Sequence, residues 1–318
     1  MQNGKPIHVR ATTQNFSEQA YLDANPDVAE AVRARVFRSG RHHFETFGEK
    51  EKRKLLFGTG AILDTKQRKL ERIRRLLRDD MPCVESAAGF DFLTPELREE
   101  FKIIDTSNVS SNDYDGIVLS LIDRHASGLI LDCGAGKRGR YFDNVVNYEI
   151  VQYDSTDVRG VAEVLPFRDG VFDAVISIAV LEHVKDPFRC AAELMRVLKP
   201  GGEIVCCVPF LQPYHGYPHH YYNMSAQGLV NLFADHVHVD SVQVIDSMLP
   251  IWSLVWIIQL WADGLSGKTR KSFLDMRIGD FLGSPMQFLN EPFVRELSAE
   301  KNKELASACL LQAHRKSN

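Results

Sequence analysis

The stretch at residues 128–136 narrows the choice of fold more than any other part of the chain. Residues 128–131 read as a short uncharged strand, which runs directly into Asp132, Gly134 and Gly136. Two glycines, two positions apart at the end of a strand, let the backbone approach a ligand closely, in the crevice where open α/β sheets bind ligands. A Gly-x-Gly motif is weak evidence by itself, so its meaning depends on the segments that come after it in the chain.

From residue 113 onward, helical and extended patterns alternate. A helix is expected over 113–125, and strands are expected over 128–133, 145–150, 156–161, 172–178 and 203–208. Nearly continuous apolar runs are typical of parallel strands that are buried on both faces. The alternation therefore predicts an α/β fold, with a parallel sheet between layers of helices.

A carboxylate ends the second predicted strand. Glu149 stands where an acid can accept hydrogen bonds from both hydroxyls of a ribose, as acids do in dinucleotide sites. Asp154 is the alternative candidate for this contact. The glycine loop and an acid at this point together favour a nucleoside-like ligand.

Four further strings come after the glycine loop in order. They are Leu-Pro-Phe at 165–167, Phe-Asp-Ala-Val at 172–175, Leu-Glu-His-Val at 181–184 and Leu-Lys-Pro-Gly-Gly at 198–202. With the loop, they resemble the class I S-adenosylmethionine-dependent methyltransferases of the small-molecule type, over about residues 128–210. The resemblance implies a Rossmann-like sheet of seven strands whose last strand is antiparallel, and the apolar segment 306–314 is expected to be that strand.

The resemblance also implies S-adenosylmethionine as the cofactor and assigns residues to its parts. Asp132, Gly134 and Gly136 would face the methionine part, and Glu149 would hold the ribose. The other implied contacts are Ala162 and Glu163 beside the adenine, and Ile178 and Ala179 near the reactive sulfonium. Transfer from a cationic sulfonium needs little beyond an in-line nucleophile, proton removal where required and exclusion of water.

Two positions depart from the family pattern. Arg138 stands where the loop usually has its third glycine, with Gly139 one place later, so the turn into the next helix is expected to differ. Val161 stands where an acid is expected before the Ala-Glu pair. Recognition of the adenine amino group is therefore expected to depend on Glu163 or on backbone groups.

Two histidines are candidates for the general base. His183 comes after the fourth predicted strand, and His215 lies in the loop after the fifth, where seven of the nine residues 214–222 are His or Tyr. Histidine has the unperturbed pKa closest to neutrality, but His183 packed against the sheet fits the motif equally well. We expect the loop to face the substrate. A metal site from His215, His219 and His220 is the alternative, and without a carboxylate or Cys in the loop no metal is expected.

Residues 14–57 are expected to form a helical accessory module. The string at 21–29, with His-Phe at 43–44 and Gly-Glu-Lys at 48–50, resembles modules found beside bacterial glycosyltransferases and other glycan enzymes. The usual closing Glu-Gly-Arg reads Glu-Lys-Arg at 51–53. The remaining predicted regions are a basic helix and linker at 58–112, and a methyltransferase domain at 113–318 with an inserted helical segment at 245–300.

Two helical segments outside the glycine loop have alternative interpretations. Residues 66–78 predict a basic amphipathic helix, which either attaches to an anionic surface or, as we favour, is a connector packed by its leucines. All three tryptophans fall in 249–261. This segment predicts either an interface with a membrane, a lipid-linked substrate or a second subunit, or a helix buried in the core.

Composition indicates which classes of protein and which cellular compartments are expected. The chain of 318 residues has a net charge of −4, which argues against a protein that coats nucleic acid. Six cysteines without a CxxC motif do not form a recognisable disulfide framework. The N-terminus lacks the apolar region of a signal peptide, and the apolar charge-free run 247–262 is shorter than the ~20 residues of a membrane span. A cytoplasmic protein is expected, with peripheral membrane contact through the tryptophan segment as an option.

These features together predict a methyltransferase that acts on a small-molecule or carbohydrate acceptor in glycan biosynthesis, at oxygen. The carbohydrate part depends on the N-terminal resemblance alone. One alternative is methylation of a lipid-like or quinone-like molecule. Another is a non-catalytic scaffold with a vestigial cofactor site, against which the intact Asp132, Gly134, Gly136 and Glu149 argue.

Overall fold

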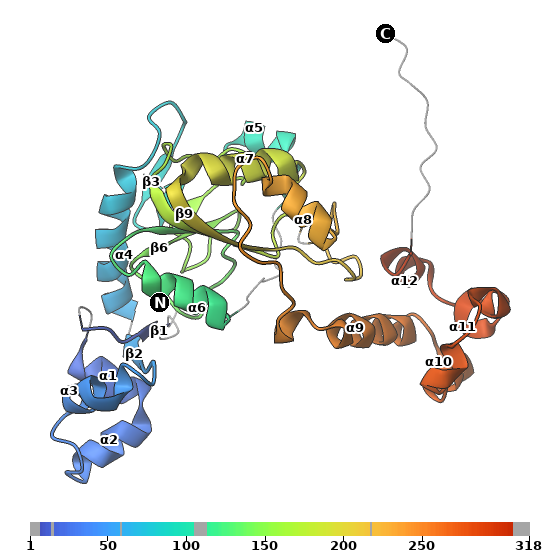
Figure 1. The fold of residues 1–318 in the computed structure, drawn as a ribbon, viewed down its shortest axis with the longest axis horizontal. Helices are drawn as coiled ribbons and strands as arrows, with labels where there is room; N and C mark the ends of the chain where they lie inside the picture. The colour runs from blue at the N-terminus through green and yellow to red at the C-terminus, as the bar shows by residue number, and fades with distance from the viewer. Residues whose placement is uncertain (1–6, 14–15, 58, 105–112, 217, 308–318) are drawn as a thin grey trace. The chain divides into compact units, whose positions relative to one another are not determined.

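The computed structural model describes residues 7–13, 16–57, 59–104, 113–216 and 218–307 (Figure 1). The chain divides into two compact units, Met1–Val208 and Pro209–Asn318. The boundary between them lies inside the predicted 113–318 domain. The domain limits drawn from the sequence stay predictions.

The first unit contains a sheet of seven strands in the order β3-β4-β7-β6-β5-β8-β9. Its strands are β3 (Val84–Ser86), β4 (Gly89–Asp91), β5 (Ile130–Cys133), β6 (Val145–Glu149), β7 (Val158–Arg159), β8 (Phe172–Ile178) and β9 (Leu198–Cys207). Neighbouring strands pair in parallel, except β3 and β4, which form an antiparallel hairpin. The predicted Rossmann-like, seven-stranded α/β class is confirmed.

The antiparallel strand of this sheet differs from the expectation. It is β3, from the part of the chain predicted to be a linker. Of the segment 306–314 that was expected to close the sheet, residues 308–314 lie outside the described residues, and Ala306 and Ser307 are not in a strand. Strands β3 and β4 have three residues each, too few to show an alternating pattern. The parallel pairing of β4 with β7 holds the hairpin on the sheet.

Three of the described helices accompany the sheet, and of these the sequence predicted only α6, over 113–125. They are α5 (Pro95–Glu100), α6 (Gly116–Arg124) and α7 (Pro187–Val197). The Asp115 carboxylate caps α6 by accepting hydrogen bonds from the first backbone N–H groups. Val118 and Leu121 then pack against Ile130 and Ala174 of the central strands. This packing places the beginning of α6 beside the end of β5.

Residues 16–57 fold around a small aromatic core. The elements are α1 (Glu18–Ala24), α2 (Pro26–Arg33), α3 (Gly40–His43) and a π-helical turn η1 (Phe44–Gly48). A two-stranded antiparallel ladder of β1 (Ile7–Arg10) and β2 (Lys54–Phe57) flanks them, which the sequence did not predict. Tyr21 and Phe44 are fully buried, and the Tyr21 hydroxyl lies 2.9 Å from Nδ1 of His43.

The basic helix is α4 (Thr59–Arg74), which begins and ends earlier than predicted. Its apolar residues Leu70 and Ile73 are buried, as expected for a packed connector, while Arg68 and Arg72 are exposed on its other side. Lys66 and Lys69, which the pattern placed among solvated charges, are buried as well.

These two lysines bind the sheet and the loop after β6. Nζ of Lys66 donates to the carbonyl of Thr156 at 2.6 Å. Nζ of Lys69 donates to the carbonyl of Val145 at 2.6 Å and pairs with the Asp157 carboxylate at 2.6 Å. Burial lowers the pKa of Lys69, and the Asp157 charge opposes that shift. The two ammonium groups thus donate hydrogen bonds to buried backbone carbonyls of Thr156 and Val145.

We expect Lys69→Met to destabilise the first unit by about 3–5 kcal/mol, because it leaves the Asp157 carboxylate buried without its partner cation. Arg72→Met is the matched control, since Arg72 lies on the exposed side of the same helix. Urea unfolding monitored by circular dichroism measures both variants. Equal stability of the two variants would contradict a structural role for Lys69.

The second unit is helical in its described part. Its helices are α8 (Ala226–Phe233), α9 (Pro250–Asp263), α10 (Gly267–Leu274), α11 (Pro292–Arg295) and α12 (Ala299–Glu304), with 3-10 turns η2 (Asp246–Met248), η3 (Ile278–Phe281) and η4 (Pro285–Phe288). Ala262, Phe273 and Phe293 form its core, and Trp261 stacks on Phe273.

Helix α9 combines the two interpretations of the tryptophan segment. Trp261, near its end, donates its indole N–H to the carbonyl of Phe293 at 2.8 Å and belongs to the core. Trp252, near its beginning, is 62% exposed, and Ile251 and Val255 are exposed beside it. Among the described helices, none is long and apolar enough to cross a membrane.

Candidate functional site

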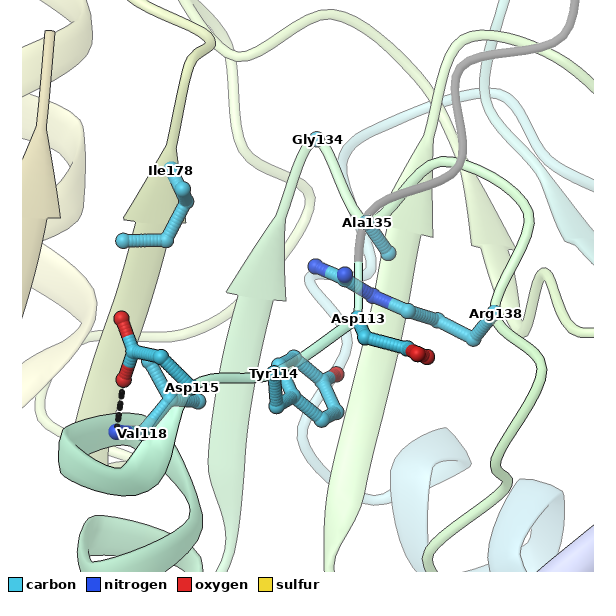
Figure 2. A pocket seen from close by; sticks show the side chains of 8 residues that line it. All are labelled: Asp113, Tyr114, Asp115, Val118, Gly134, Ala135, Arg138 and Ile178. Atoms are coloured by element: carbon cyan, nitrogen blue, oxygen red, sulfur yellow. Dashed lines mark hydrogen bonds between the residues drawn. The ribbon is translucent and has the colours of Figure 1, made fainter. Parts of the chain in front are cut away.

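A pocket lies at the carboxyl end of β5, where the sequence predicted the ligand loop (Figure 2). The beginning of α6, the β5 loop and the end of β8 form its wall. The lining residues are Asp113, Tyr114, Asp115, Val118, Gly134, Ala135, Arg138 and Ile178. Of the predicted site residues, Gly134 and Ile178 line the pocket directly, and Asp132 is bonded to two of the lining side chains, Tyr114 and Arg138.

The β5 loop requires glycine at both predicted positions. Gly134 and Gly136 have φ of +73° and +62°, the left-handed region that glycine adopts without strain. A Cβ atom on Gly134 would lie 2.3 Å from Cγ2 of Val180, which is closer than atoms can pack. The backbone N–H groups of Gly134 and Ala135 both donate to the carbonyl of Tyr148, so β6 holds the loop in this conformation.

Asp132 is fully buried at the end of β5. Its Oδ2 atom accepts hydrogen bonds from the Tyr114 hydroxyl and from Arg138, whose Nε lies at 2.9 Å. Its Oδ1 atom is buried and has no hydrogen-bond partner among the described residues. A carboxylate oxygen in this position is costly unless something outside the protein donates to it.

Glu149 lies beside the glycine loop. Its Oε2 atom accepts from the backbone N–H of Gly136 at 2.7 Å, and its Oε1 atom accepts from Ile150 at 2.8 Å and Val151 at 3.3 Å. Burial raises the pKa of Glu149, and the three backbone donors oppose the shift. The structure thus joins Glu149 to the loop. The rival Asp154 has an exposed side chain, and its backbone carbonyl accepts from Lys66.

The two residues expected beside adenine are both buried. Ala162 and Glu163 come after β7, and Glu163 is 3% exposed. The Glu163 carboxylate accepts from the backbone N–H of Lys185 at 2.9 Å and of Asp186 at 3.4 Å, and burial raises its pKa. Glu163 therefore links the β7 loop to the start of α7. Its contact with adenine stays a prediction.

The end of β8 has an unusual backbone. Ala179 has φ of +55°, which is uncommon for a residue with a Cβ atom, and its N–H donates to the carbonyl of Cys207 on β9. The turn directs the next side chain, Val180, toward Gly134. Ile178 and Ala179 thereby lie beside the glycine loop, and their place near the sulfonium stays a prediction.

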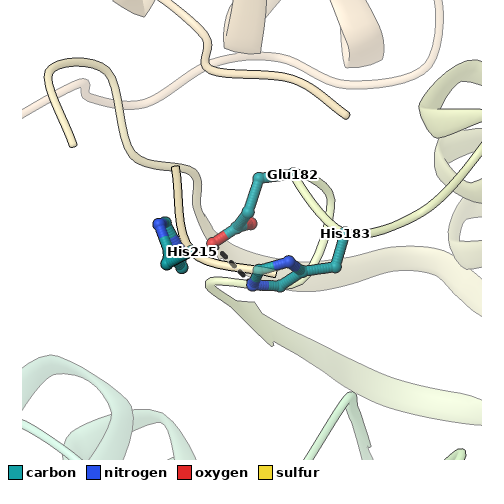
Figure 3. A group of neighbouring side chains, drawn as sticks. All are labelled: Glu182, His183 and His215. Carbon is teal, nitrogen blue, oxygen red and sulfur yellow. Dashed lines mark ion pairs between the residues drawn. The ribbon is translucent and has the colours of Figure 1, made fainter. Parts of the chain in front are cut away.

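The turn after β8 also carries Glu182, whose burial the sequence did not reveal (Figure 3). Its side chain is inaccessible to solvent, and burial raises its pKa to about 8. Nε2 of His183 lies 3.7 Å from Oε1 of Glu182. At neutral pH the Glu182 carboxyl is mostly protonated, so it faces His183 as a neutral group.

His215 belongs to the second unit, whereas His183 belongs to the first. Nδ1 of His215 lies 2.8 Å from the carbonyl oxygen of Pro213. The centres of the His215 and Trp256 rings are 5.2 Å apart. Because a carbonyl only accepts, the hydrogen bond places the proton on Nδ1 and leaves Nε2 as the basic nitrogen. Burial lowers the pKa of His215, which keeps the ring neutral at pH 7.

His220, in the same loop, forms hydrogen bonds with other residues of that loop. Nδ1 of His220 accepts the backbone N–H of His215 at 3.0 Å, and Nε2 of His220 lies 2.8 Å from Oδ1 of Asn223. Both ring nitrogens of His220 are therefore engaged within the loop, and the loop's role toward a substrate stays a prediction.

The family comparison matches the part of the chain that contains the β5 loop. Residues 131–206, from β5 to β9, match the methyltransferase domain family. Over 61 residues the chain is 41% identical to an uncharacterized methyltransferase of Mycobacterium sp. (strain KMS), covering 19% of this chain and 24% of that protein. Over 59 residues it is 48% identical to the demethylmenaquinone methyltransferase of Clavibacter sepedonicus, covering 19% and 21%. The chain thus spans about a quarter of the length of these relatives or less.

Two solved structures are also similar to parts of this chain. One is a methyltransferase of Thermotoga maritima, described as a possible histamine N-methyltransferase, with 21% identity, a TM-score of 0.28 and coverage of 38% of this chain and 70% of that one. The other is phosphoethanolamine N-methyltransferase 2 of Haemonchus contortus, with 16% identity, a TM-score of 0.32 and coverage of 74% and 59%.

The buried Glu182 predicts a pH dependence of stability. In the folded chain its pKa is about 8, whereas in the unfolded chain it ionises above the ordinary 4.5, so stability falls as pH rises between these values. Glu182→Gln, which stays neutral, should remove this loss, so that its free energy of unfolding is level between pH 5 and pH 8. Between these pH values the wild-type protein should lose on the order of 1–4 kcal/mol that the variant keeps. Thermal unfolding across this range, with the exposed Glu71→Gln as control, measures the effect. A wild-type slope that survives in Glu182→Gln would show that another group causes it.

Proposed function

We propose that this protein is an S-adenosylmethionine-dependent methyltransferase. The observation that carries the proposal is the juxtaposition of Asp132, the two left-handed glycines and Glu149 at the end of β5. The match of residues 131–206 to the methyltransferase domain family supports it, because those residues include this site. A vestigial site gives no reason for two positions that only glycine adopts without strain to stand beside a buried acid.

The residues of the pocket fit the chemistry of this cofactor. The Oδ1 atom of Asp132, buried without a donor among the described residues, suits the amino group of the methionine part. The absence of a side chain on Gly134 makes room for Val180, and the loop lines the pocket with its backbone there. Each Glu149 oxygen already accepts from the backbone, and carboxylate oxygens have further lone pairs that can accept from ribose hydroxyls.

When bound, S-adenosylmethionine supplies a methyl group on a cationic sulfonium. The chain itself needs to position the acceptor and take its proton. His215 is suited to take the proton, since its Nδ1 is held by the carbonyl of Pro213 and its Nε2 keeps a lone pair at neutral pH. His183, beside the buried Glu182, is the second candidate base.

For the acceptor we propose a small molecule that is methylated at oxygen, with a carbohydrate as the first class to test. Supporting this are the aromatic and histidine-rich loop at 214–222 and the N-terminal resemblance to modules of glycan enzymes. A lipid-like or quinone-like acceptor is the second candidate. It is favoured by the exposed apolar beginning of α9, and one similar protein is a demethylmenaquinone methyltransferase.

Calorimetric titration with S-adenosylhomocysteine tests the cofactor. We expect the wild-type protein to bind it, and Glu149→Ala to weaken binding by about 1–3 kcal/mol because charge-assisted hydrogen bonds to the ribose are lost. Asp154→Ala is the matched control, since its exposed carboxylate is the rival for this contact. A loss of affinity in Asp154→Ala and none in Glu149→Ala would reverse the assignment.

The general base is tested by single-turnover methyl transfer with labelled S-adenosylmethionine and the best acceptor from a panel of sugars, sugar nucleotides and hydroxyquinones. We expect His215→Ala to lower the rate by on the order of 10²–10⁴-fold with cofactor affinity unchanged. Because its pKa is lowered from 6.5, the wild-type rate should be level near pH 7 and fall only at more acid pH. His183→Ala is measured beside it. A histidine whose replacement impairs cofactor binding or folding in step with activity has a structural role.

A further inference from the structure

The Arg138 side chain is the one feature of the pocket that the resemblance to known loops does not explain. It replaces the third glycine of the usual pattern, and only 6% of the side chain is exposed. Figure 2 shows its guanidinium between Ala135 and Tyr114. The guanidinium lies 4.1 Å from the centre of the Tyr114 ring, so it is stacked as well as charged. The backbone N–H of Arg138 donates to Ser155 Oγ, which fixes where the side chain starts.

Arg138 and Asp132 form a buried ion pair inside the ligand pocket. Nε and one terminal nitrogen of Arg138 lie 2.9 and 2.8 Å from the same oxygen, Oδ2 of Asp132. The other oxygen, Oδ1, has no hydrogen-bond partner among the described residues. A buried pair of this kind is weak evidence for a stabilising role, because removing two charges from water costs about as much as their attraction returns. A pair that binds a ligand of matching charges has a reason to be retained.

Within a pocket that Asp113 and Asp115 also line, the charges of Asp132 and Arg138 match those of an amino-acid zwitterion. On one side lies the unsatisfied carboxylate oxygen of Asp132, which suits an ammonium group. On the other lies a planar guanidinium, which is the side chain best shaped to bind a carboxylate. The two are held next to each other at the end of β5, at the distance of a hydrogen-bonded pair.

We propose that Arg138 binds the carboxylate of the cofactor's amino-acid end and, with Asp132, selects ligands that carry a complete zwitterion there. This inference rests on the proposed function, since it assigns a specificity-determining residue to the same site. It differs from a purely structural role for Arg138, in which the side chain only neutralises Asp132. In that role the side chain would not discriminate between ligands that differ only in their carboxylate.

Two ligands separate these roles, S-adenosylhomocysteine and its decarboxylated analogue, which keeps the amine. We expect the wild-type protein to bind S-adenosylhomocysteine about 10–100-fold more tightly than the analogue, the range that an Arg–carboxylate contact provides. Arg138→Met should lose this preference by weakening only the first ligand. Arg138→Lys should keep part of it, because it retains the charge without the fork. Calorimetry measures all affinities.

Because Arg138→Met leaves the Asp132 charge buried, a double variant, Asp132→Asn with Arg138→Met, removes both charges and guards against a failure to fold. It should also bind the two ligands equally. Equal weakening of both ligands in the Arg138 variants, or an unchanged preference, would overturn the inference and leave the proposed function standing. Tighter binding in Arg138→Met would overturn it too, by showing that the side chain obstructs the pocket. A folded wild-type protein that binds neither ligand would overturn the proposed function and this inference together.

Discussion

The hydrogen bond from the Gly136 N–H to the Glu149 carboxylate joins the two parts of the chain on which the rest of the site depends. It links the loop after β5 to the end of β6, so that the two acids predicted for opposite ends of one ligand are held on neighbouring strands. The Tyr148 carbonyl adds two more bonds from β6 to the loop. With the positive φ of Gly134, these bonds leave the loop a single conformation.

The same region is supported from a distant part of the sequence. Helix α4, which lies far before β6 in the sequence, donates hydrogen bonds from Lys66 and Lys69 to carbonyls of β6 and of the segment after it. The Lys69–Asp157 pair is fully buried, so its charges are not screened by solvent. The N-terminal part of the chain is thus not merely attached to the sheet. It supplies the donors that hold the loop next to Glu149 in place.

Burial also sets the protonation of ionisable groups in each of the two units. Glu182 is kept neutral up to about pH 8, whereas desolvation keeps His215 unprotonated at neutral pH. Asp132 and Arg138, by contrast, form a buried ion pair in which each charge compensates the other. In the first unit, the site therefore has one compensated ion pair, and Glu182 on the turn after β8 is kept uncharged by burial.

The sequence by itself determined the α/β class, the five parallel strands from 128 to 208 and the glycine loop with its two acids, because apolar runs and short motifs are local properties. It could not determine the hairpin of β3 and β4, whose short strands have no pattern and are held by pairing with β7. It also placed Lys66 and Lys69 in solvent, because periodicity does not show which carbonyls need a donor. The bond of Glu149 to the loop, the burial of Glu182 and the position of Arg138 over Tyr114 depend on contacts between distant residues. Only the tertiary structure decided them, since burial and pairing arise when separate segments meet.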